Sequence, residues 1–452
     1  DESTAKDSKL INAYVEKSNT TGDYWIVKRP GLFQYGNTLS GVGRGVFNWN
    51  DVIYSIFGGT LYRAGVSVGS VSAAGMYHFS QAPGPAGGTA RLVMNNGTSA
   101  YVYDGLSLTQ LSGVNFPGNT YVDSLVLGCG YLDGTLYVMD TKGGIHGSDA
   151  PDNNPTVWTD VLNLIYAQIE ADGGVFLTKQ LVYIVAIGQW STEIFYDAGN
   201  ATGSPLGAVQ GAKINYGCVH AQSVQEIDGS LFWLATNRSS ASQVILLDNL
   251  KPAIVSTKPI ERLLGEADFT SVMSFGIKYE GHRFYGFTLK NDNLTLVYDL
   301  TDKTWAQWTD TNGDYFPIVA NTFLPNTGRV LQHETNGKLY LMDSEYTTDD
   351  GDAITVDIYT PNFDGGVRRR KQLNMMEFIG DQTEGSIFQV RVNDHDYATD
   401  KWTNFRNVYM NVKKPILSNC GTFMRRATHI RHQCPTRMRL QAIELQIDLG
   451  TL

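Results

Sequence analysis

The sequence predicts an all-β protein: a β-propeller of six or seven blades over residues 30–350, followed by a β-sandwich-like domain over residues 351–452. Three observations support this fold class. A short turn-and-strand phrase recurs along the first 350 residues, the chain contains 47 glycines in 452 residues, and apolar and polar side chains alternate cleanly in strands beyond residue 353. Residues 1–29 form a polar N-terminal arm ahead of the propeller.

The recurring phrase is typified by DGTLYVMD at residues 133–140. Asp133 and Gly134 supply the positive φ angles that a tight hairpin turn needs. In the strand that follows, Leu136 faces one side and Tyr137 the other. Because nearly every residue of this strand is apolar or aromatic, both faces are expected to be covered, as in stacked sheets. Related phrases are GGTLYRAG (58–65), DGSLFWLA (228–235), EGHRFYGF (280–287) and NGKLYLMD (336–343).

The distances between these turns match the length of propeller blades. Turn glycines occur at positions 59, 97, 134, 229, 281 and 337, and a related strand pair begins at Lys179. Successive markers are 38, 37, 45, 50, 52 and 56 residues apart, and a four-stranded blade takes roughly 40 to 50 residues. In VYDLTDKTWAQWT (297–309), a strand ending in Asp299 precedes a polar turn and a Trp-containing strand, which resembles kelch-type repeats.

Two segments depart from the strand pattern. Residues 156–174 have apolar spacing that suits an amphipathic helix, but their second half also alternates as a strand does, so both structures remain open. Residues 256–268 begin with Ser and Thr, carry Pro259 in the first turn and contain Gly265 near the end. This second pattern predicts one short helix.

Charge and cysteine content narrow the classes of function. The formal net charge of −10 argues against a general nucleic-acid binder. Residues 353–452 contain 14 Lys and Arg against 10 Asp and Glu, a net of +4, which leaves −14 on the other 352 residues and indicates two parts with different neighbours. The four cysteines are scattered and are expected to be reduced thiols in a chain made in a cytoplasm; they are Cys129, Cys218, Cys420 and Cys434. No apolar run approaches the length of a membrane span.

No motif favours catalysis, a metal or a cofactor. The acidic segments at 310–314 and 347–352 lack the ligand spacing of a calcium loop, and the polar cluster at 393–400 suits a hairpin tip. The Cys and His residues at 420, 429, 432 and 434 lack the paired spacing of a zinc site. Because nucleophile-elbow, phosphate-loop and zinc-protease motifs are absent as well, we expect no enzyme activity.

The densest basic run is GGVRRRKQ at residues 365–372. One interpretation is a solvated strand edge that charge protects from unwanted pairing. The other is an interface with an acidic protein surface or with DNA phosphate, for which Arg is well suited. The candidate interface residues are Arg368, Arg369, Arg370, Lys371, Arg425 and Arg426.

Five longer stretches are similar to segments of one known family. They are YWIVKRPGLFQYG (24–36), LVYIVAIGQWSTEIFYDAGNATGSPLGAVQGAKINYGCV (181–219), VSTKPIERLL (255–264), GHRFYGFTLKNDNLTLVYDLTDKTWAQW (281–308) and RRATHIRHQCPTRMRLQAIELQIDLG (425–450). In these stretches the chain resembles the packaged-DNA stabilisation proteins that build the tail hub, or nozzle, of short-tailed, podovirus-like bacteriophages. The match is poor over residues 60–120 and the family's usual N-terminal lead is missing. The resemblance favours a strand over a helix at residues 164–170.

The resemblance implies a structural virion protein of the phage tail, assembled in the host bacterial cytoplasm and not an enzyme. Six copies would form a ring below the portal and head-to-tail adaptor, with a tail needle, fibres or spikes at or below the ring. Packaged double-stranded DNA would pass through the lumen without sequence-specific binding, and the ring would help to retain the packaged DNA until ejection. An acidic lumen would repel DNA phosphate. The more basic C-terminal domain, residues 351–452, would form the ring or platform and dock on an acidic neighbour.

Two other classes of function remain as alternatives. One is a propeller that binds or cleaves carbohydrate, since glycosidases act through pairs of acids and this chain has many Asp residues in predicted turns. The other is a scaffold propeller for protein–protein interaction.

Overall fold

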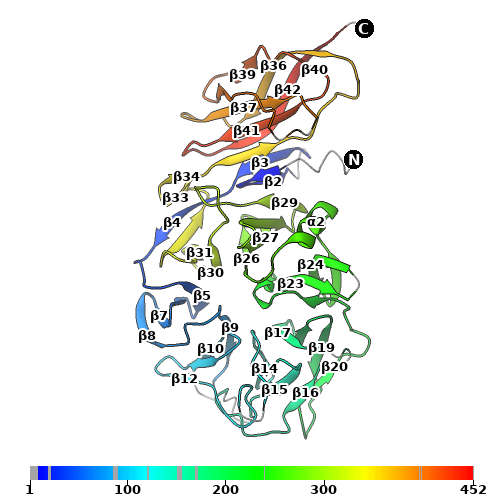
Figure 1. The fold of residues 1–452 in the computed structure, drawn as a ribbon. Helices are drawn as coiled ribbons and strands as arrows, with labels where there is room; N and C mark the ends of the chain where they lie inside the picture. The colour runs from blue at the N-terminus through cyan, green and yellow to red at the C-terminus, as the bar shows by residue number, and fades with distance from the viewer. Residues whose placement is uncertain are drawn as a thin grey trace. The chain divides into compact units, whose positions relative to one another are not determined.

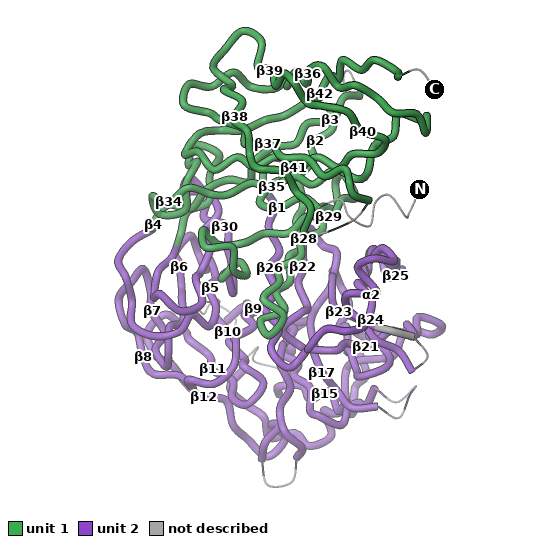
Figure 2. The backbone as a smooth tube through the Cα atoms, turned by 45° about the horizontal axis from the view of Figure 1, so that its top comes forward, with its two compact units in different colours: residues 1–34, 279–317, 340–452 green, residues 35–278, 318–339 purple. Residues whose placement is uncertain are grey.

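The structure is a computed structural model that describes residues 9–18, 22–84, 90–119, 122–149, 155–167, 170, 172–238, 240–396, 398 and 400–450. The chain divides into two compact units, shown by colour in Figure 2. Unit 1 comprises residues 1–34, 279–317 and 340–452, and unit 2 comprises residues 35–278 and 318–339. Strands dominate both units, so the predicted all-β class is confirmed. The predicted domain boundaries at residues 29/30 and 350/351 remain a prediction.

Unit 2 contains five antiparallel sheets, each built from one contiguous stretch of chain (Figure 1). The first two are β5 (Gly43–Trp49), β6 (Val52–Phe57), β7 (Thr60–Arg63) and β8 (Val66–Ser70), then β9 (His78–Ala82), β10 (Arg91–Asn95), β11 (Ala100–Tyr103) and β12 (Leu108–Gln110). The third and fourth are β13 (Gly130–Leu132), β14 (Thr135–Met139), β15 (Gly144–Gly147) and β16 (Leu164–Tyr166), then β17 (Gly174–Gln180), β18 (Tyr183–Gly188), β19 (Thr192–Asp197) and β20 (Leu206–Ala208). The fifth contains β21 (Gly217–Cys218), β22 (Gln225–Ile227), β23 (Ser230–Asn237), β24 (Ser240–Asp248) and β25 (Lys251–Ile254).

Further strands of unit 2 are β26 (Val272–Tyr279), β30 (Ile318–Leu324) and β31 (Gly328–His333), and the short 3-10 helix η1 covers Ala221–Ser223.

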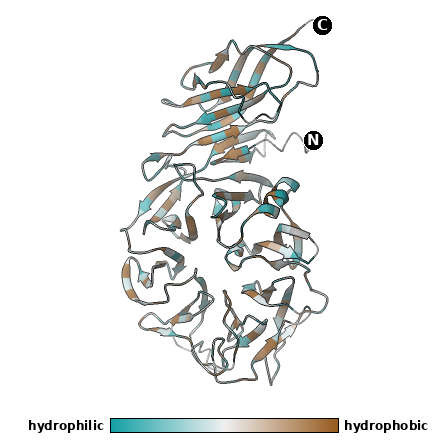
Figure 3. Ribbon diagram, in the orientation of Figure 1, coloured by the Kyte–Doolittle hydropathy of each residue, from teal (hydrophilic) through white to brown (hydrophobic). Residues whose placement is uncertain are grey.

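Successive sheets of unit 2 pack face to face, which explains why their strands are apolar on both sides. In β14, Leu136 and Val138 join a buried cluster with Val93 of the preceding sheet. Tyr137 of the same strand faces the other way, into a second cluster that is completed by the following sheet. Figure 3 shows apolar residues concentrated along the strands. Repeated stacking of this kind is the packing of a propeller, and it confirms the prediction that both faces of these strands are covered.

The hairpin turns have the backbone geometry that their residues predict. Asp133 and Gly134, between β13 and β14, have φ angles of 40° and 92°. Asp228 and Gly229, between β22 and β23, have φ angles of 55° and 81°. Both turns therefore place two consecutive residues in the left-handed region, where Gly and Asp are tolerated better than most residues.

The structure shows what the two segments that depart from the strand pattern form. Within residues 156–174 the described part contains the strand β16 and no helix, so the helical interpretation was wrong there and the strand favoured by the family resemblance is confirmed over residues 164–166. Residues 168 and 169 lie outside the described residues. The second segment forms α2 (Lys258–Glu266), with Pro259 in its first turn as predicted. No helix in the described part of the chain is long and apolar enough to cross a membrane.

Unit 1 contains a sandwich of two sheets. One follows the order β29 (Thr304–Gln307), β1 (Lys9–Ile11), β35 (Val356–Tyr359), β41 (Ala427–His432), β37 (Ile387–Asn393) and β38 (Arg406–Tyr409). The other follows the order β2 (Ala13–Lys17), β3 (Tyr24–Lys28), β42 (Arg439–Leu449), β36 (Lys371–Gly380) and β39 (Ile416–Ser418), and β40 (Thr422–Phe423) also pairs with β36. Ile358, Phe388 and Ile430 of the first sheet and Phe378 and Leu440 of the second belong to one buried cluster. The predicted C-terminal β-sandwich-like fold is therefore confirmed, and strands β1–β3 of the N-terminal region pair into it.

Unit 1 also contains further strands. They are β4 (Gly31–Tyr35), β27 (His282–Leu289), β28 (Leu294–Asp299), β32 (Leu339–Asp343), β33 (Thr348–Asp349) and β34 (Asp352–Ala353). β27, β28 and β29 form an antiparallel meander, in which β28 pairs with both of its neighbours.

Candidate functional site

The predicted basic run places three arginines on the surface of unit 1. Arg368, Arg369 and Arg370 lie in the loop before β36, and all three are exposed. Among the described residues, no carboxylate lies within ion-pairing distance of their guanidinium groups. Three consecutive arginines without an internal partner present an uncompensated positive charge to the surroundings.

Lys371 has a different environment from the arginines that precede it. Its side chain is only 1% exposed. Its Nζ donates to the carbonyl oxygens of Val367 (2.5 Å), Arg369 (3.0 Å) and Met424 (2.9 Å). Lys371 therefore holds the basic loop against unit 1 from inside, and its ammonium group does not reach the surface.

The second pair of predicted interface residues is divided in the same way. Arg426 is 4% exposed and binds both carboxylate oxygens of Asp394, at 2.6 and 2.7 Å. Arg425 is exposed and pairs with Asp396. Four of the six predicted residues thus lie at the surface and two are internal, while the interface role of the set stays a prediction.

The histidines near the C-terminus have partners that explain their burial. His429 Nε2 lies 2.6 Å from Asp357 Oδ1, and its Nδ1 accepts a hydrogen bond from Arg391 Nε at 2.7 Å. Burial is the main cause that lowers the pKa of His429. His432 Nε2 lies 3.2 Å from the hydroxyls of Ser386 and Thr436, and burial lowers its pKa to about 3. Both imidazoles are therefore neutral near pH 7.

A pocket of about 480 Å³ in unit 1 was not anticipated from the sequence. Its lining includes Tyr359, Asn362, Arg391 and Trp402. The Arg391 guanidinium carbon lies 5.2 Å from the Trp402 ring centre, a cation–π contact that fixes the orientation of the arginine. The buried Nδ2 of Asn362 has no hydrogen-bond partner among the described residues. The pocket brings together strands and loops that are far apart in sequence, so no local pattern could reveal it.

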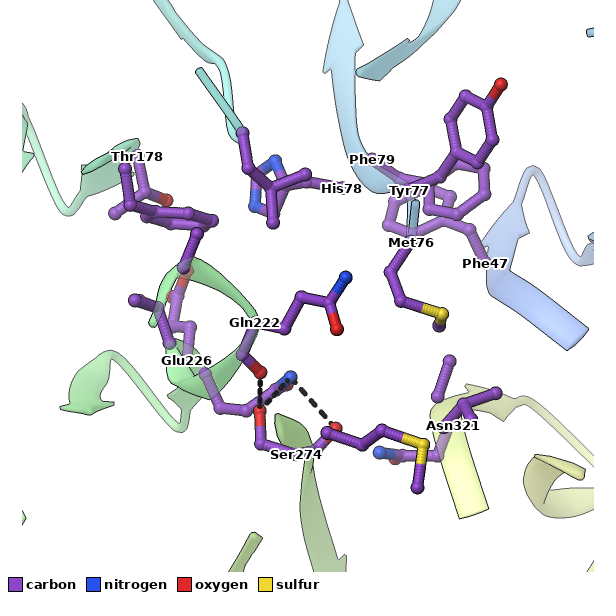
Figure 4. A pocket seen from close by; sticks show the side chains of 18 of the residues that line it. Phe47, Met76, Tyr77, His78, Phe79, Thr178, Gln222, Glu226, Ser274 and Asn321 are labelled. Carbon is purple, nitrogen blue, oxygen red and sulfur yellow. Dashed lines mark hydrogen bonds between the residues drawn. The ribbon is translucent and has the colours of Figure 1, made fainter. Parts of the chain in front are cut away.

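A second cavity, of about 260 Å³, lies within unit 2 where the first strands of its sheets meet (Figure 4). Most of its lining residues come from β5, β9, β17, β22, β23, β26 and β30, together with η1. Figure 4 shows the Gln222 side chain directed into the space that His78 and Met76 border. Ser274 Oγ donates to the Gln222 carbonyl oxygen and accepts from Gln225 Nε2, so the polar wall is internally bonded.

The ionisable groups of this cavity respond to its low polarity. Burial lowers the pKa of His78 to about 4, so its imidazole is neutral at physiological pH. Burial also raises the pKa of Glu226 above its ordinary value, and the charge of Lys179 only partly opposes this. The described residues that line the cavity therefore offer no fixed positive charge for an anionic ligand.

Comparison with known proteins identifies one family. The family model described as "Bacteriophage P22 Gp10, beta-propeller" matches residues 8–346, which is well over half of the chain. No curated protein matches the chain.

Several solved structures are similar at low identity. A computationally designed protein, Ika8, has 10% identity and a TM-score of 0.40, over 69% of this chain and 98% of that chain. The extracellular domain of the putative one-component system BT4673 from B. thetaiotaomicron has 11% identity and a TM-score of 0.43, over 90% and 58%. BamB from Moraxella catarrhalis has 10% identity and a TM-score of 0.38, over 70% and 97%.

The family assignment therefore depends on the family model, which agrees with the stacked sheets of unit 2 and confirms both the predicted propeller and the resemblance found in the sequence. The chain belongs to the phage stabilisation family of bacteriophage P22 Gp10 β-propeller proteins.

Proposed function

We propose that this chain is a non-enzymatic structural subunit of the phage virion, the tail hub or nozzle that retains packaged DNA. Membership of the phage stabilisation family over residues 8–346 is the observation that carries this proposal. In the proposed virion, six copies form a ring below the portal and adaptor, and a needle, fibres or spikes attach at or below it. Assembly takes place in the host cytoplasm.

The packing of unit 2 suits a rigid structural component. Each sheet shares buried apolar clusters with its neighbours, so a sheet cannot tilt without opening a packed core. Rigid sheets connected by surface loops also present binding surfaces without changing their own structure. These are the mechanical properties that a ring sealing a DNA-filled head requires.

The size of the cavity within unit 2 limits where DNA could run in the proposed assembly. A cavity of about 260 Å³ is far too small to hold a DNA duplex. The major groove of a duplex alone is about 12 Å wide and about 8.5 Å deep. We therefore place the proposed DNA path in a lumen between copies of the chain. The formal charge of −14 on residues 1–352 would repel phosphate from such a lumen and let DNA slide without adhering.

Arg368, Arg369 and Arg370 supply the candidate contact to a neighbouring ring. They are exposed and consecutive, and the described residues provide no carboxylate to neutralise them. An acidic face on the adaptor would pair with them and set the orientation of docking. In this proposal the basic C-terminal part holds the ring in place while the acidic remainder borders the DNA.

A reconstitution experiment tests this proposal. Phage particles produced without this chain are mixed with the purified protein, and the DNA that stays protected from nuclease is measured. We expect the wild-type chain to restore protection and the Arg368→Ala/Arg369→Ala/Arg370→Ala variant to restore much less. The control is Lys413→Ala/Lys414→Ala/Arg437→Ala, which removes the same charge from other exposed positions. Failure of the wild-type chain to protect DNA would contradict the proposed function, and equal loss in both variants would contradict the docking role of the three arginines.

A further inference from the structure

A buried histidine at the start of β27 faces two carboxylates at once. His282 Nδ1 lies 2.6 Å from Asp299 Oδ2, at the end of β28, and 3.6 Å from Asp302 Oδ2, in the turn that leads to β29. His282 and Asp299 are buried and Asp302 is partly buried. The ligand atoms of the three side chains all lie within 4.8 Å of one another. We propose that His282, Asp299 and Asp302 form a binding site for one divalent transition-metal cation, such as Zn²⁺ or Mn²⁺.

Two other buried His–Asp pairs among the described residues show what a purely structural pair needs. His146 has one carboxylate, that of Asp140 at 2.8 Å, and its second ring nitrogen is bonded to the Asn115 side chain. His429 likewise has the carboxylate of Asp357 and the guanidinium of Arg391. One carboxylate is therefore enough to orient a buried histidine in this protein. Asp302 is a second carboxylate that this structural role does not require.

The charges of the cluster favour a divalent cation. A protonated imidazole neutralises only one of the two carboxylates, and the further positive charge near Asp302, that of Lys17, is on an exposed side chain. A 2+ ion bound by a neutral imidazole neutralises both. The imidazole-and-carboxylate donor set suits Zn²⁺ and Mn²⁺, and without a thiolate it does not favour softer ions such as Cu(I).

The two separations from His282 require only a small adjustment, and the Asp299–Asp302 separation lies within 4.8 Å. Zinc lies about 2.0–2.2 Å from His nitrogen and carboxylate oxygen, which places tetrahedral ligand atoms about 3.3 Å from one another. The 3.6 Å separation of His282 Nδ1 from Asp302 is already close to this value. The 2.6 Å separation from Asp299 has to open by less than about 1 Å when the hydrogen bond is replaced by two metal bonds.

The surroundings hold the ligands from the outer side. The Thr301 N–H donates to Asp299 Oδ1 at 2.9 Å, and the Lys17 N–H donates to the Asp302 carboxylate. The Tyr14 ring packs edge-on against the His282 ring, with centres 4.8 Å apart. Hydrogen bonds that orient ligating carboxylates are a regular feature of metal sites. Since Tyr14 and Lys17 belong to β2, a bound cation would fasten the N-terminal strand to the β27–β29 meander of unit 1.

The test uses the full chain after treatment with a chelator and dialysis. Zn²⁺ and Mn²⁺ are added separately, and binding is followed by calorimetry and by the melting temperature. We expect one ion per chain and a rise of at least about 2 °C when the metal is well above its dissociation constant. Asp302→Asn should weaken binding by at least about tenfold. The matched control, Asp140→Asn, makes the same exchange at a buried His–Asp pair for which the described residues provide no second carboxylate in reach, and it should keep the full metal response.

X-ray absorption of the zinc-loaded wild-type chain provides a second readout that does not depend on any variant folding. The expected spectrum shows one imidazole nitrogen, with oxygen as the other ligands. Lack of binding by the wild type, an unchanged affinity in Asp302→Asn, or a spectrum without imidazole would each overturn the proposal. Tighter binding of Mg²⁺ or Ca²⁺ than of Zn²⁺ would also overturn it, because those ions prefer sites made of oxygen ligands alone.

Discussion

Arg29 and Asp349, 320 positions apart in the sequence, form a two-pronged ion pair inside unit 1. Arg29 Nη1 lies 3.0 Å from Asp349 Oδ1 and Nη2 lies 2.5 Å from Oδ2. The arginine side chain is fully buried and the Asp349 side chain is 12% exposed. Arg29 Nε also donates to the Asn12 side chain, and Nη2 donates to the Thr309 carbonyl oxygen. One guanidinium therefore connects the N-terminal strands of unit 1 to two segments that lie much later in the chain.

Replacing this arginine should be costly. Arg29→Met leaves Asp349 without its charged partner in a mostly buried position, which typically lowers the free energy of unfolding by about 3–5 kcal/mol. Urea unfolding of the two proteins measures the difference. Arg439→Ala is the control, because its pair with Asp381 is exposed on both sides and is expected to contribute less than about 1 kcal/mol. Equal losses in the two variants would show that burial of the Arg29 pair is unimportant.

Asp357 should make stability depend on acid pH. Burial alone would raise the pKa of its carboxyl, but hydrogen bonds from His429 and Arg431 outweigh burial and hold the pKa below its usual range. A carboxyl with a lowered folded pKa contributes stability above its unfolded pKa, which is about 3.9, and that contribution is lost as the pH falls through the folded pKa. Asp357→Asn should therefore be less stable than wild type at about pH 7, with a difference that shrinks below about pH 4. Urea unfolding of both proteins between about pH 7 and about pH 3 measures this difference in stability. A difference that stays constant with pH would contradict a lowered pKa of Asp357 in the folded protein.

Gly128 should tolerate no side chain. Its φ is 97°, and a Cβ at this position would lie 2.1 Å from the Leu177 carbonyl oxygen. Gly118 also has a positive φ, 90°, but a Cβ there meets nothing within 4 Å. We expect Gly118→Ala to cost about 1–2 kcal/mol from backbone strain alone, and Gly128→Ala to cost about 3 kcal/mol or more because the strand must also move. Similar melting temperatures for the two variants would mean that the close approach at Gly128 is easily relaxed.

Substitutions at different positions of the basic run should affect stability and docking separately. Lys371→Met removes three hydrogen bonds to backbone carbonyls and is expected to lower the free energy of unfolding by about 1–3 kcal/mol. Alanine at the three exposed arginines, positions 368–370, should change it by less than about 0.5 kcal/mol, as at ordinary surface sites. Chemical unfolding of both variants, alongside the nuclease-protection assay, tests the distinction. A large loss of stability in the arginine variant would mean that these side chains have a structural role.

The sequence predicted features that depend on neighbouring residues. The turn at Asp133 and Gly134 and the two faces of the strand from Leu136 to Met139 follow from turn chemistry and two-residue alternation, and both are present. The helix at 258–266 was likewise predictable from its start and stop residues. Such local rules act within a few positions of the chain.

Features that depend on contacts between distant residues could not be predicted from such local rules. Arg368 and Lys371 are both basic residues of one short run, so the sequence does not distinguish them. Arg368 is exposed, whereas the Lys371 side chain is buried and binds backbone carbonyls that include that of Met424. The Arg29–Asp349 pair and the approach of Tyr14 to His282 join positions hundreds of residues apart. Their pairing is set by how strands assemble into sheets, which a local pattern does not encode.

The most direct test of the central claim is electron microscopy of phage particles made with and without this chain. We expect particles that lack the chain to have no six-fold ring at the distal end of the tail, and we expect their heads to lose DNA. Complete tails and full heads in the absence of the chain would contradict the proposal that it forms the hub that retains the genome.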